Sequence, residues 1–323
     1  MKKISIFVIA LLLLAIFTVL GGFFWYRSAI APVSNNIAPH RFVINKGASA
    51  QQIANKLEKE KLIKSSFAFK LYLQYKGLTT SIPPGEFNIP QNLTTGEVVT
   101  LLLKGPSEIW VTIQEGLRRE EIALKLAQTF AQNASAVETW EDEFLSLSTG
   151  REGFLFPDTY LFPKDATPAK VFEKLSMTFN DRFTQTNTAF SLNEIVTMAS
   201  LIEREAVTDE ERPIVAGIML NRLEGDWPLQ IDASVQYALG KKGNWWPKGL
   251  TTDQIQSTSS AYNTYTNTGL PSGPIASPGL SSLKAADSPV RTEYWFYIHD
   301  SEGKIHYAKT LDEHNRNIQK YLR

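Results

Sequence analysis

An uncharged apolar run lies close to the start of the chain. Ile4 to Tyr26 contains no charged residue, and it ends in the four consecutive aromatic residues Phe23 to Tyr26. As a helix at about 1.5 Å per residue, a run of this length covers the ~30 Å hydrocarbon core of a bilayer. Lys2 and Lys3 precede the run and only Arg27 closely follows it, which predicts a cytoplasmic N-terminus by the positive-inside rule.

A cleaved signal peptide is the rival interpretation of this run. Signal peptides have a shorter apolar region, of about 7–15 residues, and end at a small-x-small site. Ala29-Ile30-Ala31 is such a site, but Pro32 follows it directly and makes a poor protease substrate. We therefore expect a cytoplasmic stub and uncleaved single-pass anchor over residues 1–27, a linker over 28–39, and an ectodomain outside the cytoplasm.

A pattern of strand, glycine and amphipathic helix then occurs twice, with an offset of 69 residues, as from Gly47 to Gly116. In the first copy Arg41 to Gly47 leads to the helical pattern Ile53 to Leu57. In the second copy Trp110 to Gly116 leads to Ile122 to Leu126. Each copy predicts a short β-branched strand, a glycine able to take a positive φ, and a helix with one apolar face.

The residues between the two copies predict three further elements. Ser66 to Tyr75 has helical periodicity, Glu86 to Ile89 follows a Pro-Pro-Gly turn as a strand, and Thr94 or Thr95 caps a helix that runs to Lys104. Residues 40–105 thus form a small βααβα-like module, which is either a binding or positioning module or a structural spacer. Residues 106–323 form a larger mixed domain, so the fold class is α+β.

Composition narrows the range of functions. The 323 residues are 43% hydrophobic, enough to bury a core and form about two domains, which excludes disorder and fibrous repeats. The 33 basic residues balance the 33 acidic ones, so nucleic acid is not an expected partner. The chain has no Cys and only four His, without an H-E-x-x-H motif. We therefore expect no metal site and no cofactor.

One predicted helix carries candidate catalytic chemistry. Ser191 to Glu194 is a capping-box pattern that opens a helix running to about Ala206. On a helical wheel, Glu203 and Glu205 lie about 80° to either side of the apolar arc, so the two carboxylates diverge by about 160°. One helix therefore supplies at most one catalytic carboxylate to a given cleft. A carboxyl group at the rim of an apolar face has a raised pKa and suits a general acid, although such a group more often forms an ion pair.

The stretch from Ala261 to Gly279 is rich in Tyr, Asn and Thr and is interrupted by Gly and Pro. The hydroxyl and amide groups of these side chains can hydrogen-bond the hydroxyl and acetamido groups of a sugar polymer, and the aromatic rings can pack on its apolar ring faces. As composition alone, the same stretch is also typical of a long surface loop.

Taken together, the chain resembles the endolytic murein transglycosylase (YceG-like) family over nearly its whole length. The motifs that carry the resemblance are Ala199-Ser200-Leu201-Ile202-Glu203-Arg204-Glu205, Asn221-Arg222-Leu223, Leu229-Gln230-Ile231-Asp232, Tyr262-Asn263-Thr264-Tyr265, Gly269-Leu270-Pro271 and Gly273 to Gly279. The resemblance implies a LysM-like module over 40–105 and a YceG-like catalytic domain over 106–323.

The resemblance also implies a reaction and a site. The enzyme would be a lyase that cleaves the bond between N-acetylmuramic acid and N-acetylglucosamine within nascent peptidoglycan strands, leaving 1,6-anhydromuramic ends and terminating strand elongation. Glu203 would be the catalytic acid, while Glu205 would have a structural or electrostatic role, pairing with Arg222. The residues expected to bind sugar and polarise the reacting groups are Gln230, Asp232, Tyr262, Asn263 and Tyr265. Peptidoglycan strands and the penicillin-binding synthases of the cell wall are the expected partners.

Two alternatives stay open at this point. A muramidase would use the same cleft with water as the nucleophile, and Asp232 would then be the second carboxylate. A non-catalytic scaffold would bind cell-wall synthases through the 40–105 module, and Glu203→Gln would then leave function intact. Because this substitution is nearly isosteric, we expect the variant to fold normally, and a large drop in its thermal stability would instead indicate that Glu203 is a structural partner.

Overall fold

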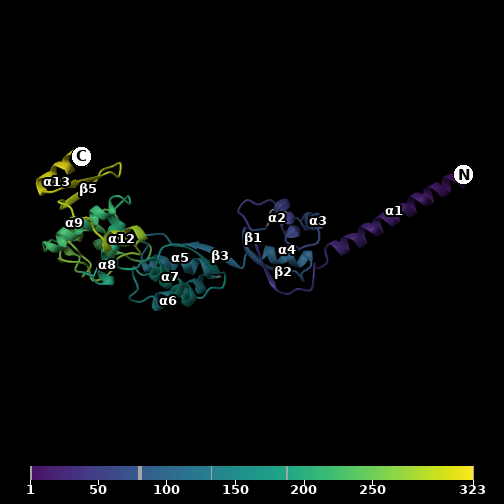
Figure 1. Ribbon diagram of the computed structural model, residues 1–323, viewed down its shortest axis with the longest axis horizontal. Helices are drawn as coiled ribbons and strands as arrows, with labels where there is room; N and C mark the ends of the chain where they lie inside the picture. Colours follow the sequence, from purple (N-terminus) through teal and green to yellow (C-terminus); the bar gives the residue numbers. More distant parts are fainter. Residues whose placement is uncertain (1, 79–81, 132, 187, 323) are drawn as a thin grey trace. The chain divides into compact units, whose positions relative to one another are not determined.

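The computed structural model describes residues 2–78, 82–131, 133–186 and 188–322, and its elements are labelled in Figure 1. The chain divides into two compact units. The first unit contains the chain up to Trp110 together with Leu161–Lys164, and the second contains Val111–Tyr160 and the chain from Asp165 onward. Helices and antiparallel strands are present in both units, which agrees with the predicted α+β class.

The first unit begins with α1 (Lys2–Ala29), which Figure 1 shows as one uninterrupted helix. Its N-terminal position and apolar composition are those of a candidate membrane span. The elements that follow are β1 (Pro39–Ile44), α2 (Ala50–Lys59), α3 (Ser66–Lys76), β2 (Gly85–Pro90) and α4 (Thr95–Leu103).

The order of these elements matches the predicted βααβα pattern. β1 pairs antiparallel with β2, from Pro39 opposite Pro90 to Ile44 opposite Gly85. The core of the module consists of fully buried side chains, among them Phe42, Leu57, Phe69, Phe87 and Leu102. The likeness of this module to LysM stays a prediction.

The segment expected to be a linker is bonded to the module. The carbonyl of Ile30 accepts a hydrogen bond of 2.9 Å from the Thr95 N–H, and the Ser34 N–H donates to the Gln91 carbonyl at 3.2 Å. The Ser34 hydroxyl also bonds the Gln91 side chain at 3.1 Å. The chain that leaves α1 is therefore held against the module.

The predicted internal repeat is confirmed. β3 (Glu108–Thr112) and α5 (Arg119–Phe130) repeat β1 and α2 with the same offset. The glycines at the two corners, Gly47 and Gly116, have φ of 82° and 74°, a conformation that costs a glycine nothing and other residues about 1 kcal/mol.

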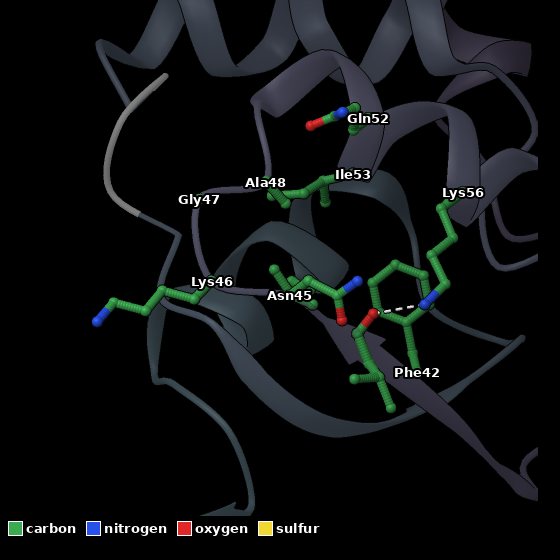
Figure 2. Close-up of a pocket in the computed structure, with 10 residues that line it drawn as sticks. Phe42, Asn45, Lys46, Gly47, Ala48, Gln52, Ile53 and Lys56 are labelled. Atoms are coloured by element: carbon green, nitrogen blue, oxygen red, sulfur yellow. Dashed lines mark hydrogen bonds between the residues drawn. The ribbon is translucent and has the colours of Figure 1, made fainter.

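The corners of the two copies have different surroundings. Figure 2 shows the first corner, where a cavity of about 330 Å³ lies beside Gly47 and the Lys56 ammonium donates to the Val43 carbonyl at 2.5 Å. At the second corner the Gly116 N–H donates to the Ser277 carbonyl at 2.8 Å, and the Ser277 N–H donates to the Leu117 carbonyl, also at 2.8 Å. The second corner is thus occupied by a segment from the long polar stretch.

Within the residues that the structure describes, the strands form two sheets. One has the order β1-β2-β3-β4, with β4 at Thr159–Pro163, and the other pairs β5 (Phe296–His299) with β6 (Ile305–Ala308). The remaining helices are α6 (Ala134–Leu147), α7 (Pro168–Arg182), α8 (Leu192–Glu205), α9 (Arg212–Glu224), α10 (Asp232–Leu239), α11 (Thr252–Ser257), α12 (Leu280–Asp287) and α13 (Leu311–Tyr321). Within the second unit α8 packs against α9 and α12, and α13 packs against β5 and β6.

Several helix starts are specified by residues three positions apart. Ser49 with Gln52, Thr94 with Glu97, Ser191 with Glu194, and Thr251 with Gln254 each form a capping box at the start of a helix. Such a box satisfies amide groups that the helix itself leaves without partners.

Candidate active site

Helix α8 places the two candidate carboxylates at its C-terminal end. It starts after Ser191, whose hydroxyl accepts the Glu194 N–H at 3.3 Å as the capping-box pattern predicts. Ile195, Ala199 and Ile202 are fully buried, so the apolar face of α8 is fixed in the core of the second unit. With that face fixed, the last turn projects Glu203 and Glu205 toward different neighbours.

Glu203 lies in a network that joins three helices. Its Oε2 accepts hydrogen bonds from the Gly279 N–H at 2.9 Å and from the Ser282 hydroxyl at 2.7 Å, and Arg212 Nη2 lies 3.5 Å from its Oε1. Only 7% of its side chain is exposed. Because Gly279 caps α12 and Arg212 opens α9, the carboxylate links α8 to both helices, and its charge suits the positive N-terminus of α12.

Arg212 has further partners in the same network. Its Nε donates to the Ser282 hydroxyl at 3.0 Å, and it forms an ion pair with Asp209. Glu115, from the second repeat, lies beside the network, and burial together with the charge of Glu203 raises its pKa. Glu203 is therefore a paired carboxylate whose hydrogen-bonding partners belong to the protein itself.

Glu205 lies in a different place, on the wall of a cavity of about 440 Å³. The cavity is lined by Glu205, Arg222, Leu229, Gln230, Asp232, Tyr265, Phe296, Tyr297, Ile298, Leu311 and His314. The Tyr297 hydroxyl donates to Glu205 Oε2 at 2.8 Å. Burial raises the pKa of Glu205, the hydrogen bond from Tyr297 lowers it, and the nearby charge of Asp232 raises it, with a net upward shift.

Three of the predicted sugar-binding residues lie in this cavity. The Tyr265 hydroxyl donates to Asp232 Oδ1 at 2.6 Å. Gln230 has a φ of 55°, and its N–H donates to the Thr264 carbonyl at 3.0 Å. A left-handed backbone is strained for a side chain with a Cβ, and such strain is common at functional sites. The two motifs that contain these residues are thus joined by a backbone hydrogen bond.

Arg222 also lines the cavity. Its Nε donates to the Trp295 carbonyl at 2.9 Å, and its Nη1 donates to the Leu229 carbonyl at 2.6 Å. The guanidinium also lies 5.4 Å from the centre of the Phe296 ring. These two nitrogens bond carbonyl groups that position β5 and the Leu229–Asp232 segment. The expected pairing with Glu205 takes the form of a charge interaction across the cavity that both residues line.

Comparison with known proteins identifies the family. A model of the YceG-like family matches residues 42–320. The chain belongs to the YceG-like family.

Two curated relatives of this YceG-like chain have the name endolytic murein transglycosylase. The relative from Bacillus subtilis strain 168 is 31% identical over 335 residues, which cover 94% of this chain and 91% of that protein. The relative from Streptococcus pneumoniae strain D39 is 27% identical over 366 residues, covering 99% of this chain. The YceG-like chain spans 66% of the length of the pneumococcal protein.

A solved structure is also similar to the YceG-like chain. The crystal structure of a yceG-like protein from Listeria monocytogenes has a TM-score of 0.55 and 28% sequence identity. The match covers 86% of this chain and 98% of that one.

The other two predicted sugar-binding residues of the YceG-like chain, Tyr262 and Asn263, contact other residues of the protein. Asn263 is fully buried, and its amide donates to the carbonyls of Ile255 at 2.8 Å and Thr258 at 2.9 Å. Its Oδ1 accepts the Tyr265 N–H at 3.0 Å. The Tyr262 ring packs 4.7 Å from that of Tyr237. Asn263 thus positions Tyr265 through its backbone N–H. Contact of Tyr262 or Asn263 with sugar stays a prediction.

Sequence reasoning missed the C-terminal wall of the cavity. Tyr297 and Phe296 come from β5, and His314 comes from α13, where its ring stacks on Phe296 at 5.1 Å. The aromatic run Tyr294 to Tyr297 was the available signal. Among the residues that the structure describes, no group of three or more His, Cys, Asp or Glu side chains could hold a metal ion.

The contacts of Glu203 replace the expectation, made from the sequence, that Glu203→Gln is as stable as wild type. We now expect the variant to fold but to lose about 1–2 kcal/mol of its free energy of unfolding, because the amide keeps one acceptor but loses the charge beside Arg212. Guanidinium denaturation followed by circular dichroism measures the change. Glu194→Gln is a matched control, since its carboxylate is exposed and bonds only within the Ser191 capping box. A Glu203→Gln transition that coincides with wild type would contradict the structural role.

Proposed function

We propose that the chain is a peptidoglycan lyase, an endolytic murein transglycosylase, whose active site is the cavity around Glu205. The observation that carries the proposal is the half-buried Glu205 on the wall of this cavity, with a raised pKa, beside Gln230, Asp232 and Tyr265. A carboxyl group that is protonated at higher pH than usual is suited to donate a proton to a glycosidic oxygen. Membership of a family in which relatives have that name supports the same reaction.

In the proposed mechanism Glu205 acts twice. It first protonates the oxygen that leaves carbon 1 of the muramyl residue, and the bond between that carbon and oxygen breaks. The resulting carboxylate then accepts the proton of the carbon-6 hydroxyl of the same sugar, whose oxygen attacks carbon 1. The product is a 1,6-anhydromuramyl end, and no water is consumed. The attached nucleophile has the proximity advantage of an intramolecular reaction.

Glu203 remains the alternative acid from the sequence motif. Its carboxylate oxygens are engaged by Arg212, Gly279 and Ser282, and Glu203 is not among the residues that line the cavity beside Glu205. The contrast between the two environments is the reason for placing the reaction at Glu205.

The nature of the products tests the proposed function. The full chain in detergent micelles would be incubated with purified glycan strands, and the fragments would be analysed by mass spectrometry. Internal cleavage to anhydro ends supports the lyase, whereas reducing ends heavier by one water indicate a muramidase. In that case Asp232→Asn should abolish cleavage, because a hydrolase needs the second carboxylate. Absence of both products from folded protein would favour a scaffold.

The pH dependence of cleavage should report the proton on Glu205. Because its folded pKa is raised above the usual value of a glutamate, we expect the rate to fall as pH rises through that pKa. Tyr297→Phe removes a hydrogen bond that favours the charged form, so the descending limb should move to higher pH. Initial rates across a pH series measure the shift. A Tyr297→Phe enzyme that is slower but has an unchanged profile would contradict this assignment.

We also propose that α1 is an uncleaved anchor with its N-terminus in the cytoplasm. The apolar composition of α1 supports a span, and the lysines before it support the orientation. The enzyme would then act outside the cytoplasm, where it would release strands from the synthases that extend them and so terminate their elongation.

A further inference from the structure

Helix α3 has apolar side chains on two opposite faces. Ala68, Phe69 and Leu73 are buried in the core of the module. Phe67, Leu71 and Tyr75, by contrast, are 60%, 42% and 82% exposed. Their spacing of four residues places them along one stripe of the helix, hereafter the α3 outer face. The solvent side of a helix in a soluble domain is normally polar, so this face calls for an apolar covering.

The α3 outer face is continuous with the end of α1. The Trp25 ring, in the last turns of α1, lies 5.9 Å from the Phe67 ring. A mostly apolar cavity of about 560 Å³ continues this contact and is lined by Tyr26, Ile30, Leu71, Tyr72, Tyr75 and Lys76. The bonds from Ile30 and Ser34 to the module, described above, fix the chain between α1 and this face.

Because the α3 outer face is continuous with α1, the position of α1 in a membrane determines the depth of that face. Trp and Tyr at the end of a membrane span lie in the headgroup region, where an amphipathic ring finds both apolar and polar partners. Because Trp25 and Tyr26 end the apolar run and Trp25 contacts Phe67, the α3 outer face lies at that same level. The exposed residues Lys64 and Lys76 at the two ends of α3 are placed to reach lipid phosphates.

We propose that the α3 outer face lies in the outer interfacial layer of the lipid bilayer and holds the module against the membrane. The inference rests on the proposed anchor and adds a second, interfacial contact to it. A transmembrane helix of a partner protein is the competing occupant. Close packing of helices in a membrane favours small residues, whereas this face consists of the large side chains of Phe67, Leu71 and Tyr75.

Single spin labels can test the placement, because the natural chain has no Cys to remove. Leu71→Cys and Tyr75→Cys report on the face. Ile16→Cys, exposed on α1, reports on the anchor, and Glu58→Cys, exposed on α2, is the matched control on the module. The labelled full chain would be reconstituted in vesicles of phosphatidylethanolamine and phosphatidylglycerol. Collisions with oxygen, which concentrates in lipid, and with a water-soluble nickel chelate would be compared.

We expect oxygen collisions to dominate at 16, 71 and 75, with 71 and 75 shallower than 16, and nickel collisions to dominate at 58. If the labels at 71 and 75 show the same collision rates as the label at 58 while the label at 16 is in lipid, the proposed membrane contact of the α3 outer face is wrong and the anchor is supported. If 16 is also in water, the anchor and the face both fail. Shielding of 71 and 75 from both reagents indicates a protein partner and overturns the lipid assignment.

Discussion

Glu205→Gln is expected to lower the rate of glycan cleavage by about 10²–10⁴-fold and to remove the 1,6-anhydro product. This range is the usual contribution of a positioned general acid. The amide can still accept the hydrogen bond from Tyr297, so the cavity should keep its shape. The measurement is the single-turnover rate on purified glycan strands, with product ends identified by mass spectrometry.

Glu203→Gln is the matched control for this prediction, since the same change is made two residues away on the same helix. We expect it to retain cleavage within about tenfold at a temperature where it is folded, because its carboxylate has a structural role. The opposite result, an inactive and folded Glu203→Gln with an active Glu205→Gln, would move the acid to the residue that the sequence motif indicates.

The stability of Glu205→Gln supplies an independent check. A carboxyl group with a raised folded pKa stabilises the fold most below its unfolded pKa, and that contribution is lost as pH rises through the folded value. The amide cannot ionise. The variant should therefore lose less stability than wild type as pH rises from 4.5 through the raised folded pKa.

Arg222→Met should lower the free energy of unfolding by about 2–4 kcal/mol, because the carbonyls of Leu229 and Trp295 lose their donors. Methionine fills a similar volume, so the loss reports chiefly the hydrogen bonds. Cleavage should fall as well, since these bonds position the Leu229–Asp232 segment at the cavity. Guanidinium denaturation followed by circular dichroism measures the stability.

Arg222→Lys separates hydrogen bonding from charge. One ammonium group lacks the planar fork that reaches two carbonyls in different directions, so we expect an intermediate loss of stability. Equal stability of the lysine and arginine proteins would show that charge, rather than the pair of carbonyl bonds, is what the fold requires. An unchanged midpoint of the unfolding transition for Arg222→Met would contradict the predicted losses of stability for Arg222→Met and for Arg222→Lys.

Much of the fold was predictable because it is specified locally. The capping box at Ser191 fixes where α8 begins, and the buried face of that helix follows from spacing alone. The internal repeat was visible because the two corner glycines and the helices after them keep one offset. The hydrogen bonds between residues 28–39 and the module were not predictable, because a composition of small polar residues with two prolines is equally typical of a linker that does not contact the module.

The site was predictable only in part, for a physical reason. Helical spacing correctly separates Glu203 from Glu205, but it cannot say what lies opposite each carboxylate. Ser282 and Tyr297, which decide that difference, lie 79 and 92 residues further along the chain. Gln230, Asp232 and Tyr265 were indicated by the motifs that carry the family resemblance, and they do gather at one cavity. The Asn263 amide could bind a sugar by its chemistry, but it is buried and donates instead to the carbonyls of Ile255 and Thr258.

The capping boxes also bear on the order in which the molecule folds. Each box joins residues three apart, so a helix start can form early in an otherwise unfolded chain, at little entropic cost. The cavity instead joins α8 to β5 and α13 across a long stretch of sequence, and closing such a loop is slow. During refolding, helical signal should therefore return before cleavage does, and the recovery of activity should mark the last event of folding.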